Sequence, residues 1–105
     1  MQSTARPAAA PVRVTVVESP ACHLCEDAKR VLAEFASTHL LTVETLDVFS
    51  EPGLALMARH RAAMSPLVLV NGNFFSQGRL PRRKLAKLLT DLSPSTPLAQ
   101  PTTAG

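Results

Sequence analysis

The sequence contains no Trp and no Tyr, and it has no apolar run that approaches the length of a membrane span. The first eleven residues also lack the continuous apolar segment of a secretory signal. Lys and Arg outnumber Asp and Glu by only three, far below the dense basic loading of a dedicated nucleic-acid binder. These absences argue against membrane-spanning, secreted and nucleic-acid-binding proteins, and they predict a cytoplasmic protein without nucleic-acid or membrane partners.

The two ends of the chain lack a periodic apolar face. Residues 1–11 and 93–105 are rich in Pro, Ala, Ser and Thr, so neither segment can offset its ordering entropy by burying apolar surface. We therefore expect disordered tails at 1–11 and 93–105, and one folded domain over residues 12–92.

Inside that domain, apolar periodicity predicts strands alternating with helices. The expected strands are 12–17, 42–48, 67–70 and 73–76, and the expected helices begin at 22, 51 and 81. The second helix is expected to run to residue 63, with Ser50 as its cap and Pro52 in its first turn. The order β-α-β-α-β-β-α predicts an α/β fold, in which a four-stranded mixed sheet carries helices on both faces.

The only two cysteines lie three positions apart, in Cys22-His23-Leu24-Cys25, where the first strand meets the first helix. A pair this close constrains the unfolded chain little, so a structural role is disfavoured. At a helix N-terminus, free N–H groups and the helix dipole favour a thiolate. We therefore expect Cys22 to be the nucleophile, with a lowered pKa. Cys25 is expected to be the resolving thiol, and His23 to tune the pKa of Cys22.

Metal binding is the main alternative for the cysteine pair. A structural zinc site needs four ligands, whereas this chain offers two cysteines and three separated histidines, His23, His39 and His60. Covalent haem attachment needs a His directly after the second Cys, and Glu26 stands there instead. We therefore expect no metal site, and the chemistry is assigned to a redox-active disulfide.

A second signal is Ser65-Pro66, just before the most apolar strand. Pro66 is either a simple strand opener or the second residue of a cis peptide bond. A cis bond would place the exposed backbone of Ser65 beside Cys22. An incoming peptide would then pair with it in extended form.

These motifs together resemble the thioredoxin superfamily, and residues 19–26 are similar to small glutaredoxin-like proteins. The resemblance implies a thioredoxin-like fold, a cis Pro66, and substrate contacts from Ser65, Pro66, Leu24 and Gly78. Three features depart from true glutaredoxins and disfavour glutathione binding. They are Ser19 in place of a basic residue, His23-Leu24 between the cysteines, and Gln77-Gly78-Arg79 in place of a Gly-Gly motif. No tightly bound cofactor is expected.

The resulting hypothesis is a monomeric thiol–disulfide oxidoreductase. It would reduce or exchange the disulfides of protein clients or small molecules, and it would be recharged by a reductase or by glutathione. Two alternatives stay open: a glutaredoxin-like protein that holds an iron–sulfur cluster through Cys22 of two subunits, and a redox switch without catalysis.

Basic residues cluster around the start of the last predicted helix. They are Arg79, Arg82, Arg83, Lys84 and Lys87. A solvated helix face explains the cluster most simply. The alternative is a docking surface for an acidic client or an anionic cofactor.

Overall fold

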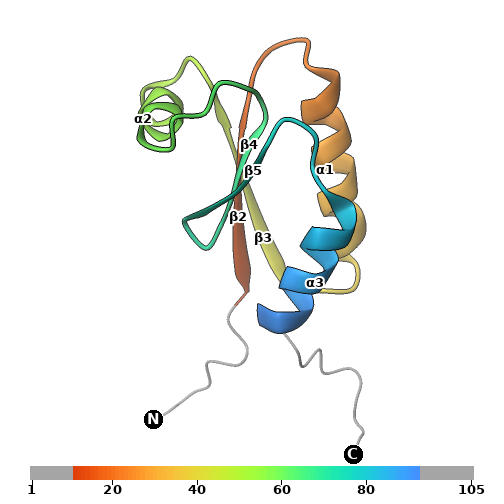
Figure 1. Ribbon diagram of the computed structural model, residues 1–105. Coiled ribbons are helices and arrows are strands. Elements are labelled where there is room, and N and C mark those ends of the chain that lie inside the picture. Colours follow the sequence, from red (N-terminus) through yellow and green to blue (C-terminus); the bar gives the residue numbers. More distant parts are fainter. Residues whose placement is uncertain (1–10, 93–105) are drawn as a thin grey trace, which may run out of the picture.

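The computed structural model describes residues 11–92, so the predicted tails fall, apart from Pro11, outside the described residues. The elements follow the predicted order (Figure 1). They are β2 (Val12–Glu18), α1 (His23–Ala36), β3 (Leu41–Asp47), α2 (Glu51–Arg59), β4 (Leu67–Val70), β5 (Asn73–Gln77) and α3 (Arg82–Leu92).

The four strands form one mixed sheet in the order β3-β2-β4-β5. β2 runs parallel to β3 and antiparallel to β4, with Val14 opposite both Val43 and Val70. A tight turn at Asn71 and Gly72, both at positive φ, joins β4 to β5 as the Asn-Gly pair predicts. The predicted α/β fold with a four-stranded mixed sheet is confirmed.

Helices cover both faces of the sheet because successive strand residues point to opposite sides. Val16 is buried in the larger core, which α1 and α3 close through Leu32, Leu85 and Leu89. Val17 is buried in the smaller core, against which Leu46, Val48, Leu56, Met57 and Ala62 pack. In Figure 1, α1 and α3 lie on one side of the strands and α2 on the other.

Most elements begin or end one residue away from the predicted positions, and the largest difference is at the end of α2. α2 ends at Arg59 rather than at residue 63, because Arg61 adopts a positive φ of 51° that a helix cannot continue. Ala36 and Leu92 continue the apolar stripes of their helices in the sequence, which predicts burial, but both are exposed at the helix ends. Cys22 is the N-cap of α1 rather than its first helical residue.

No helix between residues 11 and 92 has the length and apolar character that a bilayer crossing requires.

Candidate functional site

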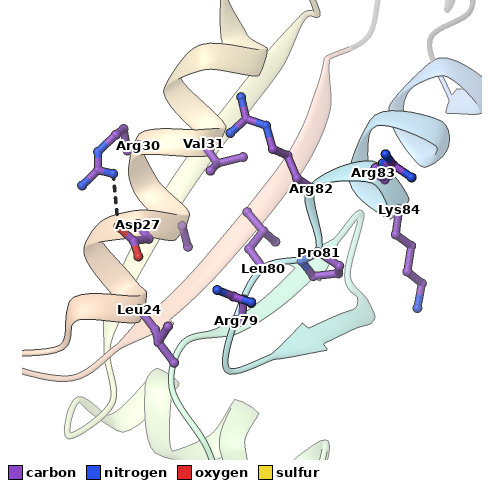
Figure 2. Close-up of a pocket in the computed structure, with 11 residues that line it drawn as sticks. Leu24, Asp27, Arg30, Val31, Arg79, Leu80, Pro81, Arg82, Arg83 and Lys84 are labelled. Carbon is purple, nitrogen blue, oxygen red and sulfur yellow. Dashed lines mark ion pairs between the residues drawn. The ribbon is translucent and has the colours of Figure 1, made fainter.

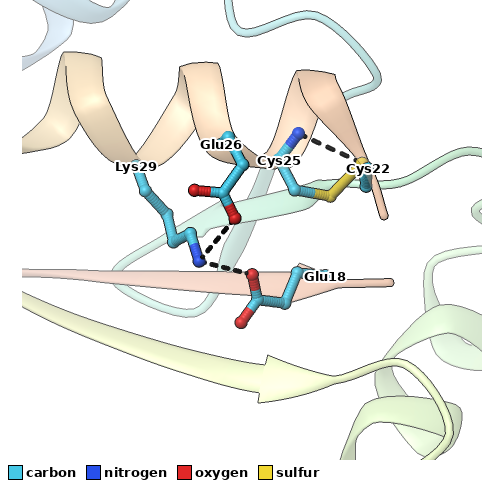
Figure 3. The surroundings of a disulfide bond; sticks show 5 residues. All are labelled: Glu18, Cys22, Cys25, Glu26 and Lys29. Carbon is cyan, nitrogen blue, oxygen red and sulfur yellow. Dashed lines mark hydrogen bonds and ion pairs between the residues drawn. A yellow bond between two sulfur atoms is a disulfide. The ribbon is translucent and has the colours of Figure 1, made fainter. Parts of the chain in front are cut away.

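Cys22 occupies the N-cap of α1, the position that Ser, Thr, Asp or Asn usually fills. Its backbone is extended, with φ −111° and ψ 108°, and it follows the turn that leaves β2. The Cys25 N–H donates a hydrogen bond to Cys22 Sγ at 3.1 Å (Figure 3). One of the free N–H groups of the helix terminus is therefore directed at the sulfur, which favours negative charge there in the reduced protein.

Cys22 and Cys25 are joined as a disulfide, with their Cα atoms 5.2 Å apart. The two residues differ in exposure. Cys22 is half-buried, whereas Cys25 lies on the inner face of α1 with only 1% of its surface exposed. A bulky disulfide from another protein can therefore approach Cys22 but not Cys25. The assignment of nucleophile and resolving thiol stays a prediction.

A charged network ties the end of β2 to the first turns of α1, next to the disulfide (Figure 3). Lys29 Nζ lies 2.8 Å from Glu18 Oε1 and 3.3 Å from Glu26 Oε2. The hydrogen bond to Glu18, and to a smaller extent the one to Glu26, raise the pKa of Lys29 above its usual value. The network holds the two ends of the segment that carries Cys22. Glu26 and Lys29 have helical spacing in the sequence, but no sequence signal points to Glu18.

The Ser65–Pro66 peptide bond is cis, so this prediction is confirmed. Pro66 is buried, and its carbonyl oxygen accepts a hydrogen bond from the Gly78 N–H at 3.0 Å. Leu67 pairs with Val17, so Pro66 lies at the end of the sheet from which β2 leads to Cys22. The strands thus bring Cys22 and Pro66, distant in sequence, to one end of the sheet.

The side chain of Gln77 also holds the loop before Pro66. Its Oε1 accepts hydrogen bonds from the N–H groups of Ala63 at 2.9 Å and Met64 at 3.0 Å. Gln77 and Gly78 thus fix the loop from β5, and sequence patterns did not indicate this role for either. A substrate contact by Gly78 stays a prediction, since the residue is buried and its N–H is engaged with Pro66.

Gly78→Ala should destabilise the domain by about 1–2 kcal/mol, because Gly78 has a φ of +78° that L-residues disfavour. The added Cβ would also lie 2.9 Å from Met64 Cε, so the tip of Met64 has to move. Gly72→Ala is the matched control, since its φ is +83° and no atom lies within 4 Å of its Cβ position.

Urea unfolding of both variants measures the two effects. The larger loss of stability in Gly78→Ala than in Gly72→Ala reports the contact with Met64. When Met64 is also replaced by Ala, Gly78→Ala and Gly72→Ala should therefore lower the free energy of unfolding by the same amount. A Gly78→Ala protein as stable as the unchanged chain would contradict this account of the loop.

The remaining predicted residues lie around the disulfide. His23 is exposed at the start of α1. Leu24 is half-buried and lines a groove between α1 and the segment that leads into α3. Across residues 11–92, no three His, Cys, Asp or Glu side chains come together in a way that could hold a metal ion.

Comparison with solved structures supports the fold. A thioredoxin-like protein from Clostridium perfringens matches with a TM-score of 0.62 at 13% identity, over 78% of this chain and 71% of that one. A mutant thioredoxin from Halobacterium salinarum matches with 0.60 at 17% identity, over 78% and 74%. Chloroplastic thioredoxin z matches with 0.62 at 16% identity, over 80% of each chain. These likenesses show a thioredoxin-like fold.

No curated protein matches the chain in sequence. Residues 13–90, however, match the family described as Glutaredoxin-like domain (DUF836), and this range contains every described strand and helix except the first residue of β2 and the end of α3. The fold together with the Cys22–Cys25 pair supports a thiol–disulfide redox role. The chain therefore belongs to the family described as Glutaredoxin-like domain (DUF836).

Proposed function

We propose that this protein is a thiol–disulfide oxidoreductase that reduces disulfides in protein clients. The observation that carries the proposal is the difference between the two sulfurs. Cys22 is half-buried at a helix N-cap and accepts an N–H hydrogen bond, while Cys25 is 1% exposed one turn further along α1. This difference supports attack by Cys22 and resolution of the mixed disulfide by Cys25.

In the reduced protein, the Cys22 thiolate attacks one sulfur of the client disulfide. The client's disulfide breaks, its other sulfur leaves as a thiolate that takes a proton from solvent, and a mixed disulfide forms with Cys22. Cys25 then loses its proton and attacks Cys22 Sγ. This second step releases the other client thiol and leaves the Cys22–Cys25 disulfide. Two electrons pass from the protein dithiol to the client.

Recharging requires an external dithiol or thiol donor. In a reducing compartment such as the cytoplasm, a reductase or glutathione would return the Cys22–Cys25 disulfide to the dithiol. The chain is proposed to work as a monomer.

The hydrogen bonding of the loop before β4 supports the proposal that a client binds in extended form beside Cys22. The Pro66 carbonyl is occupied by Gly78, whereas the backbone of Ser65 makes no hydrogen bond with any residue from 11 to 92. Its free backbone groups are available to pair with an extended segment, the way an added strand pairs with a sheet edge.

Catalysed reduction of insulin tests the proposed function. We expect the protein to accelerate insulin precipitation well beyond the rate of dithiothreitol alone, measured as turbidity. Parallel assays with glutathione plus its reductase, and with thioredoxin reductase, identify the donor. Cys22→Ser serves as the matched control, which keeps the fold but lacks the nucleophile.

An unaccelerated reaction with the pair fully reduced would contradict the proposal and favour a redox switch without catalysis. A coloured protein with visible absorbance after anaerobic purification would instead indicate an iron–sulfur cluster.

A further inference from the structure

A groove of about 690 Å³ runs between α1 and the segment that leads into α3 (Figure 2). Its apolar lining includes Leu24 and Val31 from α1 and Leu80 from the facing segment. Five cationic residues also line it: Arg30, Arg79, Arg82, Arg83 and Lys84. We call this surface the basic groove.

Acidic residues neutralise only part of this charge. Asp27 Oδ1 lies 3.2 Å from an Arg30 side-chain nitrogen, and Glu34 pairs with Arg82 across the gap between α1 and α3. Arg79 and Arg83 make no ion pair with any residue between 11 and 92. Both are exposed, so the basic groove keeps a net positive charge that faces solvent.

The stability of α3 does not explain these cations. Arg82, Arg83 and Lys84 occupy the first turn of the helix, and no acidic residue stands there. The N-terminal end of a helix dipole favours anions and disfavours cations, so three positive charges at this end oppose helix formation. Arg82 pairs with Glu34, and Lys84 Nζ lies 5.6 Å from the centroid of the Phe75 ring, so these two cations have partners within the fold. Arg79 and Arg83 have no such partner among residues 11–92, and they fit a role in binding better than a role in folding.

The basic groove is continuous with the redox site. Leu24, which lies between the two cysteines in the chain, is part of its lining. One end of the groove thus lies two residues along the chain from Cys22.

We propose that the basic groove docks an acidic segment of the client polypeptide and so delivers the client's disulfide to Cys22. This inference rests on the proposed oxidoreductase function and adds the chemical class of its clients. The client would place apolar side chains against Leu24 and Leu80, and carboxylates near Arg79 and Arg83.

The character of the lining favours a polypeptide over a small anion. Small-molecule sites hold their ligand with a few converging polar groups in an enclosed apolar pocket. Here every polar side chain of the lining is charged and exposed, and the cations are spread over α1, α3 and the segment between residues 79 and 81. Such a field accelerates the association of a complementary chain more than it fixes one small molecule.

The test uses two synthetic peptides of equal length, each with one intramolecular disulfide followed by a run of Glu or, in the control peptide, of Gln. Stopped-flow measurement gives the rate at which the reduced protein reduces each peptide. At low ionic strength the Glu peptide should react about tenfold faster. The ratio should fall towards one at about 1 M salt, where the Debye length is about 3 Å.

Arg79→Glu/Arg83→Glu should abolish the preference for the Glu peptide, whereas Arg13→Glu/Arg61→Glu should retain it. Both pairs are exposed, and both variants change the net charge equally. Glu at position 83 suits the first turn of α3, so the test variant should fold normally. The Gln peptide should be reduced at the same rate by both variants.

Equal rates for the two peptides at low salt would overturn the docking proposal and leave the oxidoreductase function standing. Reduction of neither peptide would overturn the proposed function itself. Binding of a fluorescent Glu peptide without cysteine, measured by anisotropy, then tests the groove independently of the chemistry. Binding of oxidised glutathione that depends on Arg79 and Arg83, without any preference for the Glu peptide, would assign the groove to a small anion and refute the inference.

Discussion

Replacing Cys25 with Ser should stop the reaction at a covalent complex with the client, while replacing Cys22 with Ser should lower disulfide reduction to the uncatalysed rate. The reason is the placement of the two sulfurs. Cys22 is accessible and accepts the Cys25 N–H, so it forms the mixed disulfide. Cys25 is 1% exposed and can reach only Cys22, so without its sulfur the mixed disulfide is not resolved.

Mass spectrometry without reductant measures this difference directly. Cys25→Ser mixed with a disulfide-bearing client should accumulate a species with the summed mass of both chains, and dithiothreitol should release it. Cys22→Ser treated in the same way should stay at its own mass. A trapped complex with Cys22→Ser instead would reverse the two roles.

The Cys25→Ser protein also isolates the chemistry of one thiol. An unperturbed thiol has a pKa of about 8.5. Alkylation of the single cysteine by iodoacetamide should reach half its maximal rate at a pH well below that value. A profile centred on the unperturbed value would show that the helix terminus does not stabilise the Cys22 thiolate, and the proposed mechanism would lose its basis.

Local patterns in the sequence were sufficient for the order of elements and for the redox pair. Val12, Val14 and Val16 alternate with Arg13 and Thr15 and are buried on one face of β2. Ser50 and Pro52 mark the start of α2, with Ser50 Oγ accepting the Gly53 N–H at 3.1 Å. The Asn71-Gly72 turn and the Cys22–Cys25 spacing are equally local. Signals of this kind depend on residues within a few positions of one another, so they can be recognised without knowledge of the tertiary structure.

Features that depend on distant contacts were not predictable. Glu18 meets Lys29 only because α1 folds back along β2, and Gln77 reaches Ala63 only because the hairpin returns β5 to the loop before β4. The basic groove likewise exists because the start of α3 packs against α1. The cations around α3 are visible in the sequence, but only the fold shows that they line one groove together with Leu24.

Gly53 shows this limit most clearly, because local and tertiary arguments give opposite signs. It lies in the first turn of α2, where helix propensity predicts that Ala would stabilise by about 1 kcal/mol. In the structure, a Cβ at this position would overlap the carbonyl oxygen of Asp47. That oxygen is already fixed, since it accepts the Ser50 N–H at 2.9 Å and the Ser50 hydroxyl at 2.6 Å.

Gly53→Ala should therefore destabilise the domain by about 3 kcal/mol, because either α2 or the turn after β3 has to move and the hydrogen bonds to Asp47 are strained or lost. Urea unfolding measures the change. Ala58→Gly, at an exposed position of the same helix, is the matched control and should cost only the propensity difference of about 1 kcal/mol. A stabilised Gly53→Ala protein would show that α2 does not approach β3 as closely as described. The consequence would extend to the site, since α2 covers the smaller core beneath Leu67, the residue that follows Pro66.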